Sequence, residues 1–308
     1  MIYEGGNGPG AGKHVVLLSG DDEYRSEEAL PMLGRILSQR HGFRCTVLFA
    51  TNPETGEIHP DEQRHIAGLE ALDDADMLVC FLRFRELPDA AMKHFVDYVE
   101  SGGPILGIRT ATHAFRYRDD SSPYAHYDFR SKSWPGGFGQ QILGDTWISH
   151  HGHHGVESTR GVVEAANADH PILRGVEDVW GPTDVYGLAN LPDDAVVLLR
   201  GAVLTGMSPD DPPVDGPKNE PMVPIAWLRE LPHENGTQKI VCSTIGAATD
   251  CESEDLRRLF VNTVYWSVGL EDSISADANV DVVGEYDPTD FGFGTFRRGV
   301  MPKDHLLR

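Results

Sequence analysis

The sequence predicts an α/β fold with a doubly wound, mostly parallel sheet flanked by helices. Short apolar runs alternate with amphipathic helical patterns through the first 115 residues, and these runs are apolar on both faces. Strands buried on both faces and separated by helices are typical of parallel βαβ units. With 308 residues, 40% of them hydrophobic, the chain is long enough to cover both faces of such a sheet.

The expected elements follow one another in regular alternation. Strands are expected at residues 14–20, 43–50, 75–84, 104–110, 194–201, 224–230 and 239–246. Helices are expected at residues 26–42, 60–72, 88–103 and 253–270. In the first helix, Ser26 is expected at the N-cap and Gly42 at the C-terminal cap, because these residue types favour those positions.

One domain is expected over residues 13–270, after a flexible glycine-rich leader at 1–12. Between about 116 and 180 the periodicity fades, and the chain becomes rich in Gly, Pro, Ser and aromatic residues. An irregular segment of this length inside a compact domain is usually a functional insertion. Residues 271–308 form an extended tail, which we expect to pack across the domain or to join copies in a homo-oligomer.

The charge of the chain limits its partners. There are 48 acidic and 26 basic residues, a formal net charge of -22, so nucleic acid and anionic membrane surfaces are not expected to bind. No apolar run approaches the roughly 20 residues that cross a bilayer, so no membrane insertion is expected. The first residues lack a signal-peptide pattern, so a cytoplasmic location is the default and an exported precursor the alternative.

Polar side chains gather where the predicted strands end, and ligands of doubly wound sheets bind at the carboxyl ends of the strands. The candidates are Asp22, Glu23, Tyr24, Arg25, Arg83, Arg85, Arg109, Thr110, His113 and Asp250. Any one of them is most often a surface or capping residue, but their joint placement indicates a site. We expect Glu23 and His113 to act in acid–base catalysis and the others to bind substrate.

The segment 102–115, GGPILGIRTATHAF, resembles a nucleophile elbow, because a strand and a tight turn precede a helix start. Its layout is like that of class I glutamine amidotransferases, whose elbow reads Gly-Ile-Cys-x-Gly-His. Arg109 stands at the cysteine position, with Thr110 beside it. A thiolate nucleophile is therefore absent, and glutamine hydrolysis is not expected. The four cysteines are far apart, so neither a disulfide framework nor a cysteine metal site is expected.

The chain resembles the ThuA-like family, a cysteine-free group with this layout named for trehalose utilisation. The resemblance rests on LLSGDDEYRSEEALP in the first loop, GIRTATHAF at the elbow, HHGHHG in the insertion, DHPILRGVEDVWGPTDVYG at 169–187 and STIGAATD at 243–250. It implies a glutamine-amidotransferase-like, flavodoxin-type domain and a link to sugar or glycoside metabolism. It implies no settled reaction.

Further candidate residues lie in and after the insertion. His170 is held extended by the proline that follows it, and it is expected either to anchor a loop or to act in catalysis. Asp184 and Tyr186 share one face of an extended chain, where they would bind sugar hydroxyls or orient a histidine. The alternative for this pair is an Asx-turn with a packed tyrosine. Trp134 and Trp147 offer flat faces for a sugar ring.

The stretch WISHHGHHGVEST, residues 147–159, holds four histidines in five positions. If the chain is extended there, His151 and His153 point to one side and His150 and His154 to the other. His151 and His153 would then supply two ligands to a divalent metal such as zinc. A metal-free role in substrate binding or acid–base chemistry and a purely structural role stay open as alternatives.

These observations favour an enzyme that acts on a glycoside or keto-sugar by acid–base or metal-assisted chemistry, without a cysteine nucleophile. Histidines near carboxylates provide proton-transfer pairs near neutral pH. The strand-end arginines would hold an anionic or polyhydroxylated group. A non-catalytic sugar-binding or assembly module and a hydrolase for an unrelated small molecule remain alternatives, because a fold does not fix a function.

Overall fold

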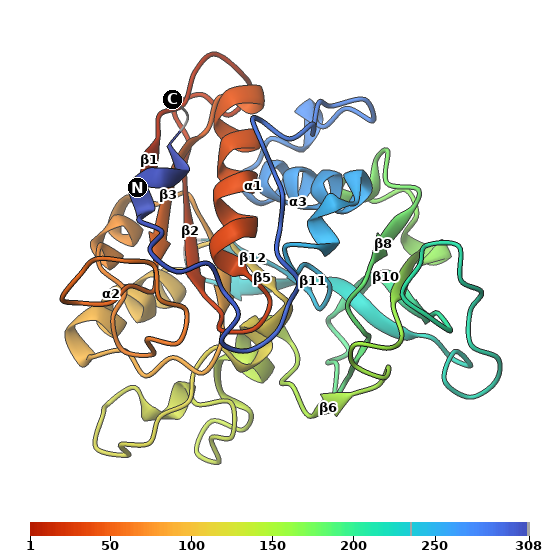
Figure 1. Ribbon diagram of the computed structural model, residues 1–308, viewed down its shortest axis with the longest axis horizontal. Coiled ribbons are helices and arrows are strands. Elements are labelled where there is room, and N and C mark those ends of the chain that lie inside the picture. The colour runs from red at the N-terminus through yellow and green to blue at the C-terminus, as the bar shows by residue number, and fades with distance from the viewer. Residues whose placement is uncertain (235, 307–308) are drawn as a thin grey trace.

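The computed structural model describes residues 1–234 and 236–306 and contains one large mixed sheet (Figure 1). In spatial order its strands are β1 (Ile2–Tyr3), β3 (Arg44–Phe49), β2 (His14–Gly20), β4 (Met77–Leu82), β5 (Ile105–Ile108), β12 (Gly236–Ser243), β11 (Val223–His233), β10 (Val196–Val203), β7 (Thr159–Val163) and β8 (Val179–Gly181). The five strands from β3 to β12 are parallel, and those beyond them at both edges pair antiparallel.

The parallel part has the strand order 2-1-3-4-5 when its members are numbered along the chain, which is the flavodoxin-like order. The predicted fold class is therefore confirmed. The antiparallel half of the sheet is an addition, and the βαβ pattern of the first 115 residues does not predict it. A separate pair, β6 (Ser149–His150) and β9 (Tyr186–Gly187), lies in and just after the insertion.

In the part of the chain that the structure describes, three α-helices cover the sheet: α1 (Ser26–His41), α2 (Asp89–Glu100) and α3 (Glu254–Ser267). Along β2, Val15 and Leu17 pack in the hydrophobic cluster of α1 and α3, whereas Val16 and Leu18 pack in the cluster of α2. Alternate residues of a strand point to opposite faces, so α1 and α3 cover one face and α2 the other (Figure 1). No helix of the described residues is long and apolar enough to cross a bilayer.

Short helical turns connect these elements. The element η4 (Gly139–Leu143) is a short π-helix. The 3-10 helices are η1 (Leu69–Asp74), η2 (Arg109–His113), η3 (Ala125–Tyr127), η5 (Ala165–Asn167), η6 (Pro171–Leu173), η7 (Asp250–Glu252), η8 (Glu271–Ser273) and η9 (Pro302–His305).

The predicted helix at 60–72 is wrong, since only the 3-10 turn η1 forms near its end. Ile66 makes a β-bridge to Ala50, and Gly68 adopts a left-handed backbone with φ 89°. The carbonyl of Glu62 accepts a hydrogen bond from the Arg85 guanidinium instead of serving a helix. Tertiary pairing therefore overrides the helical pattern of this segment.

The caps of α1 are half as predicted. Gly42 ends the helix in a left-handed conformation with φ 84°, as expected. Ser26 is not the N-cap: the helix begins at Ser26 and the N-cap is Arg25, which is also left-handed. The Ser26 hydroxyl instead lies 2.9 Å from the Ser19 hydroxyl and accepts from the Asp21 amide, so it joins the helix start to the end of β2.

The N-terminal leader and the tail up to residue 306 both pack on the domain. The leader expected to be flexible contributes β1, which pairs antiparallel with β3. The tail runs down beside α1 in Figure 1, and the amide of Gly292 donates to the carbonyl of Glu23 after β2. The tail thus packs across its own domain, while its role in a homo-oligomer stays a prediction.

Glu27 lies buried in the first turn of α1, and neither of its carboxylate oxygens has a hydrogen-bond partner among the described residues. Burial raises the pKa of Glu27 to about 8. The ordinary pKa of Glu in an unfolded chain is about 4.3, so folding takes up a proton between these values. The stability that Glu27 contributes is therefore present at low pH and is lost as the pH rises toward 8.

We expect Glu27→Gln to flatten this pH dependence, because an amide does not ionise. As the pH rises from about 5 to about 8.5, the parent should lose more of its free energy of unfolding than the variant does. The difference between the two losses should be on the order of a few kcal/mol. Urea unfolding at both pH values measures the difference. The exposed Glu70→Gln serves as control and should follow the parent. Parallel pH profiles of Glu27→Gln and the parent would show that Glu27 is not a buried neutral acid.

Candidate functional site

The carboxyl ends of β2, β4 and β5 form the edge at which the sequence places its candidates. Strand order reverses between β2 and β4, and ligands of doubly wound sheets bind at such a point. Among the described residues, the non-glycine residues with left-handed backbone are Arg25, Phe84 and Arg109, with φ 62°, 52° and 43°. Such conformations cost about 1–3 kcal/mol each and concentrate at functional sites. All three follow the ends of these strands.

Arg109, at the predicted elbow, is fully buried. Its guanidinium donates to the Asp184 carboxylate at 3.0 Å, to the Asp184 carbonyl at 3.0 Å and to the Thr244 carbonyl at 2.6 Å. It also lies 4.2 Å from the ring centre of Tyr24 and 4.1 Å from that of Tyr186. These contacts offset the cost of burying the charge. Arg109 therefore joins the elbow to the segment after β8.

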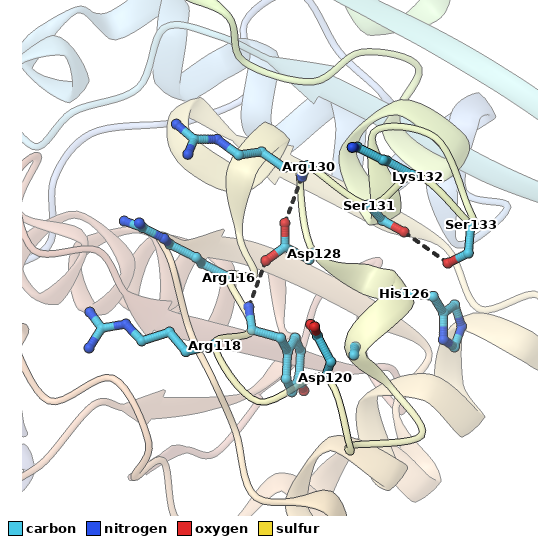
Figure 2. A pocket seen from close by; sticks show the side chains of 11 residues that line it. Arg116, Arg118, Asp120, His126, Asp128, Arg130, Ser131, Lys132 and Ser133 are labelled. Carbon is cyan, nitrogen blue, oxygen red and sulfur yellow. Dashed lines mark hydrogen bonds between the residues drawn. The ribbon is translucent and has the colours of Figure 1, made fainter.

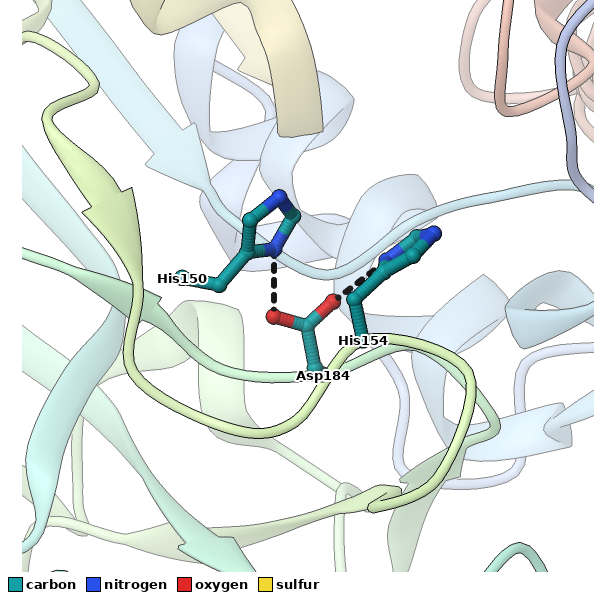
Figure 3. Close-up of side chains that lie close together, drawn as sticks. All are labelled: His150, His154 and Asp184. Atoms are coloured by element: carbon teal, nitrogen blue, oxygen red, sulfur yellow. Dashed lines mark hydrogen bonds and ion pairs between the residues drawn. The ribbon is translucent and has the colours of Figure 1, made fainter.

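Asp184 also accepts hydrogen bonds from two histidines of the insertion (Figure 3). His150 Nδ1 donates to one carboxylate oxygen at 2.7 Å, and His154 Nδ1 donates to the other at 3.1 Å. Burial raises the pKa of Asp184, but the hydrogen bonds from both histidines and the charge of Arg109 outweigh it and hold this pKa below its ordinary range. Asp184 is therefore an ionised acceptor at the centre of the cluster.

The local chain path brings the histidines to Asp184. β6 pairs His150 with Tyr186, and the amides of His151 and Gly152 both donate to the Val185 carbonyl. A Cβ at Gly152 would lie only 3.0 Å from that of Asp184, so glycine allows this close approach.

Glu23 extends the cluster toward β2. Its carboxylate lies 3.4 Å from His154 Nε2 and 3.6 Å from one guanidinium nitrogen of Arg83. The other terminal nitrogen of Arg83 donates to Asp22 at 2.8 Å. Burial raises the pKa of Glu23, an effect that the charge of Arg83 opposes only in part. The hydrogen bond to Asp184 raises the pKa of His154. His154 thus lies between two carboxyl groups whose pKa values are shifted in opposite directions, an arrangement that suits proton transfer.

The tail covers one side of this cluster, which the sequence did not predict. The ring of Phe291 lies 5.6 Å from that of Tyr24 and 5.2 Å from that of His154. Phe293 lies over the guanidinium of Arg83 at 4.8 Å. The tail has no sequence periodicity, so nothing in it signalled these contacts.

The predicted ligand pair His151 and His153 does not converge. The ring of His151 donates to the Lys218 carbonyl, and His153 is exposed while its carbonyl accepts two amides of a turn. The extended geometry was wrong because β6 ends at His150, and a turn then places His150 and His154 on the same side. His150, His154 and Asp184 each offer a ligand atom, and these atoms lie within 4.8 Å of one another.

Several other candidates make contacts within the protein. Arg25 donates to Thr289 of the tail, and Arg85 donates to the carbonyls of Glu62 and Arg83. Thr110 donates to the buried Asp21. The Asp250 carboxylate accepts from the amide and hydroxyl of Thr183 and from the amides of Gly246 and Ala247. These residues hold the loops that carry the cluster.

The remaining predicted residues divide between the cluster and other places. His113 is fully buried behind it, where burial lowers its pKa well below the ordinary value and its ring lies 5.2 Å from that of Trp147. Trp147 also packs on His150, whereas Trp134 packs on Tyr127 in the insertion. His170 accepts an amide at the start of η6 and packs against α3, so it anchors a loop and has no recorded contact with the cluster.

The sheet order and the turn after β5 define a glutamine-amidotransferase-like domain that carries Arg109 at this turn. The sequence profile of the ThuA family, described as trehalose utilisation, matches residues 15–267, and the chain belongs to this family. No match was found among curated proteins.

Two solved structures share the fold. A putative ThuA-like protein from Parabacteroides merdae is 14% identical with a TM-score of 0.53, and the match covers 96% of this chain and 99% of that one. One from Bacteroides uniformis is 16% identical with a TM-score of 0.50, covering 89% and 98%.

We expect Arg109→Ala to destabilise the fold, contrary to the usual small effect of a strand-end arginine. The substitution leaves the Asp184 carboxylate buried without its cation, which typically costs about 3–5 kcal/mol. Chemical unfolding measures this loss, and the exposed Arg40→Ala should stay within about 0.5 kcal/mol of the parent. A near-parental stability of Arg109→Ala would mean that the pair does not hold the two halves of the sheet together.

Proposed function

We propose that this protein is an enzyme of carbohydrate metabolism that acts on a glycoside or keto-sugar by acid–base chemistry at Glu23, His150, His154 and Asp184. The observation that carries the proposal is the buried Asp184 carboxylate hydrogen-bonded to two partly exposed histidines. A carboxylate that accepts from Nδ1 fixes the orientation and tautomer of an imidazole, and it stabilises the imidazolium that forms when the ring takes a proton.

His150 is the group best placed to exchange a proton with a ligand. Its Nδ1 is engaged by Asp184, its side chain is 34% exposed, and its Nε2 has no recorded hydrogen bond to a described residue. The neutral ring can therefore accept a proton at Nε2 and return it later. Glu23 and His154 form the second pair, on the side of β2.

Aromatic side chains around the cluster suit a sugar ring. The partly exposed Trp147 lies beside His150, and the partly exposed Phe291 lies beside His154. Flat apolar faces next to polar groups match a ligand with C–H faces and hydroxyl edges. The family's link to trehalose utilisation supports a carbohydrate as the ligand.

A second candidate is the metal-assisted form of this chemistry, with a divalent ion such as zinc held by His150, His154 and Asp184. One ligand atom from each lies within 4.8 Å of the others, and nitrogen and carboxylate ligands suit zinc. His154 also has Glu23 at its second ring nitrogen, as metal-bound histidines often have a carboxylate there. The nearby charge of Arg109 opposes a cation. Such an ion would polarise an oxygen of the sugar.

We expect His150→Ala to lower kcat by about 10²- to 10⁴-fold, the usual contribution of a positioned acid–base group, with little loss of stability. The measurement is turnover of a panel of glycosides and 3-keto-glycosides, with thermal unfolding as a check of folding. His151→Ala removes the neighbouring histidine and is the matched control, expected to keep parental kcat. If the parent bound sugars but did not turn them over, the protein would be a binding module and not an enzyme.

If the metal-assisted form holds, zinc should bind with about one ion per chain, and His150→Ala and His154→Ala should each weaken it by at least about tenfold. Calorimetric titration of zinc into the metal-stripped protein measures this without reference to activity. His151→Ala and His153→Ala lie in the same segment and should bind as the parent does. Equal losses in all four variants, or no binding by the parent, would leave the metal-free form.

A further inference from the structure

A group of cationic side chains lies beside the candidate site, in a chain whose net charge is -22. Arg116, Arg118, Arg130 and Lys132 line a cavity of about 690 Å³ formed by the insertion, which we call the basic hollow (Figure 2). The hollow also contains the carboxylates of Asp120 and Asp128. Its cations therefore outnumber its carboxylates, against the balance of the whole protein.

No recorded ion pair of the described residues involves these four cations, whereas Arg83, Arg109 and Arg229 are each paired with a carboxylate. Asp128 forms no recorded ion pair with these four cations, and its two oxygens accept the amides of Tyr117 and Arg130, both at 2.7 Å. Figure 2 shows these two bonds. Asp128 thus shapes the loop and leaves the guanidinium groups available to an anion.

Aromatic rings support two of the arginines. The guanidinium of Arg116 lies 5.6 Å from the ring centre of Phe84, and that of Arg130 lies 4.8 Å from the ring centre of Phe129. Phe84 is one of the left-handed residues of the strand edge, with φ 52°. Contacts of this kind reduce the freedom of a guanidinium and so lower the entropy that it loses when it binds an anion.

Phe84 also connects the basic hollow to the candidate site. Its ring contacts Arg83, whose guanidinium lies 4.4 Å from the ring centre and also approaches Glu23 of the cluster. The ring of His113 lies 5.1 Å from that of Phe84. The Phe84 side chain therefore lies between Arg116 of the hollow and the residues that surround the cluster.

We propose that the basic hollow binds an anionic substituent, a phosphate or a carboxylate, of the carbohydrate whose reacting part lies at the cluster. This proposal rests on the proposed function and narrows its substrate to acidic sugars. Planar guanidinium groups bind phosphate and carboxylate through paired, charge-assisted hydrogen bonds. In a strongly acidic protein, such a local reversal of charge would also draw an anionic ligand to this edge of the sheet.

The test is calorimetric titration with glucose 6-phosphate, glucuronate, inorganic phosphate and glucose at one fixed ionic strength. We expect an acidic sugar to bind more tightly than both glucose and inorganic phosphate. The arm that binds best distinguishes a phosphate from a carboxylate. The double variant Arg116→Gln/Arg130→Gln should lose about tenfold or more in affinity for it, since it removes two charge-assisted interactions with the anion.

The control Arg40→Gln/Lys303→Gln removes the same charge from exposed positions that have no recorded ion pair, and it should keep parental affinity. Equal losses in both double variants would reveal only a general effect of net charge and overturn the subsite. If inorganic phosphate or heparin bound as tightly as the acidic sugar, the hollow would be an unspecific anion surface. That result would also overturn the subsite.

His150→Ala separates this inference from the proposed function. We expect that variant to lose turnover but to keep the parental preference for the acidic sugar over glucose, because the hollow is intact. Loss of affinity in Arg116→Gln/Arg130→Gln without turnover of any sugar by the parent would support the subsite and reject the enzyme. If the parent turned over neutral sugars alone and did not bind acidic sugars, the result would support the enzyme and reject the subsite.

Discussion

The buried pair of Arg109 and Asp184 is the interaction on which the rest of the site depends. Arg109 follows β5 in the parallel half of the sheet, and Asp184 follows β8 at the antiparallel edge. Separating two buried charges leaves each without compensation, so the pair fixes the two halves relative to each other. Asp184 is thereby held where His150 and His154 can both reach it. The structural cation and the proposed catalytic group are consequently parts of one network.

In this network, the elbow residue Arg109 makes structural contacts. In the amidotransferase layout that the sequence resembles, the turn after this strand presents a cysteine. Here Arg109 keeps a left-handed backbone, but its side chain turns into the protein and is fully buried. The four cysteines, Cys45, Cys80, Cys242 and Cys251, are all buried, and burial raises the pKa of each thiol above its ordinary value. The partly exposed polar groups, His150 and His154, lie in the insertion instead.

Segments far apart in the chain complete the site. Glu23 comes from the loop after β2, the histidines from the insertion, and Phe291 from the tail. The insertion also forms the basic hollow, joined to the cluster through Phe84. One irregular segment thus supplies the two histidines of the proposed proton-transfer cluster and the proposed anion subsite. The insertion follows β5 and η2, so both parts are tethered to the carboxyl end of β5.

The sequence by itself determined the parallel sheet, the family resemblance and the stretch that holds the histidines. Apolar runs of strand length and Gly42 at the end of α1 are local signals, and short-range periodicity and backbone preference decide them. Glu23, Arg109 and Asp184 were likewise found from their positions at strand ends and in motifs.

Only the tertiary structure decided which residues meet. His150 and His154 converge in place of His151 and His153 because a turn follows β6, and alternation along an extended chain does not hold through a turn. The helix expected at 60–72 gives way to a bridge with Ala50, which is remote in sequence. Arg25 binds Thr289 of the tail and Asp250 binds Thr183, and local sequence does not predict partners from such distant segments. Local patterns specify the elements, whereas contacts between distant segments depend on how those elements pack.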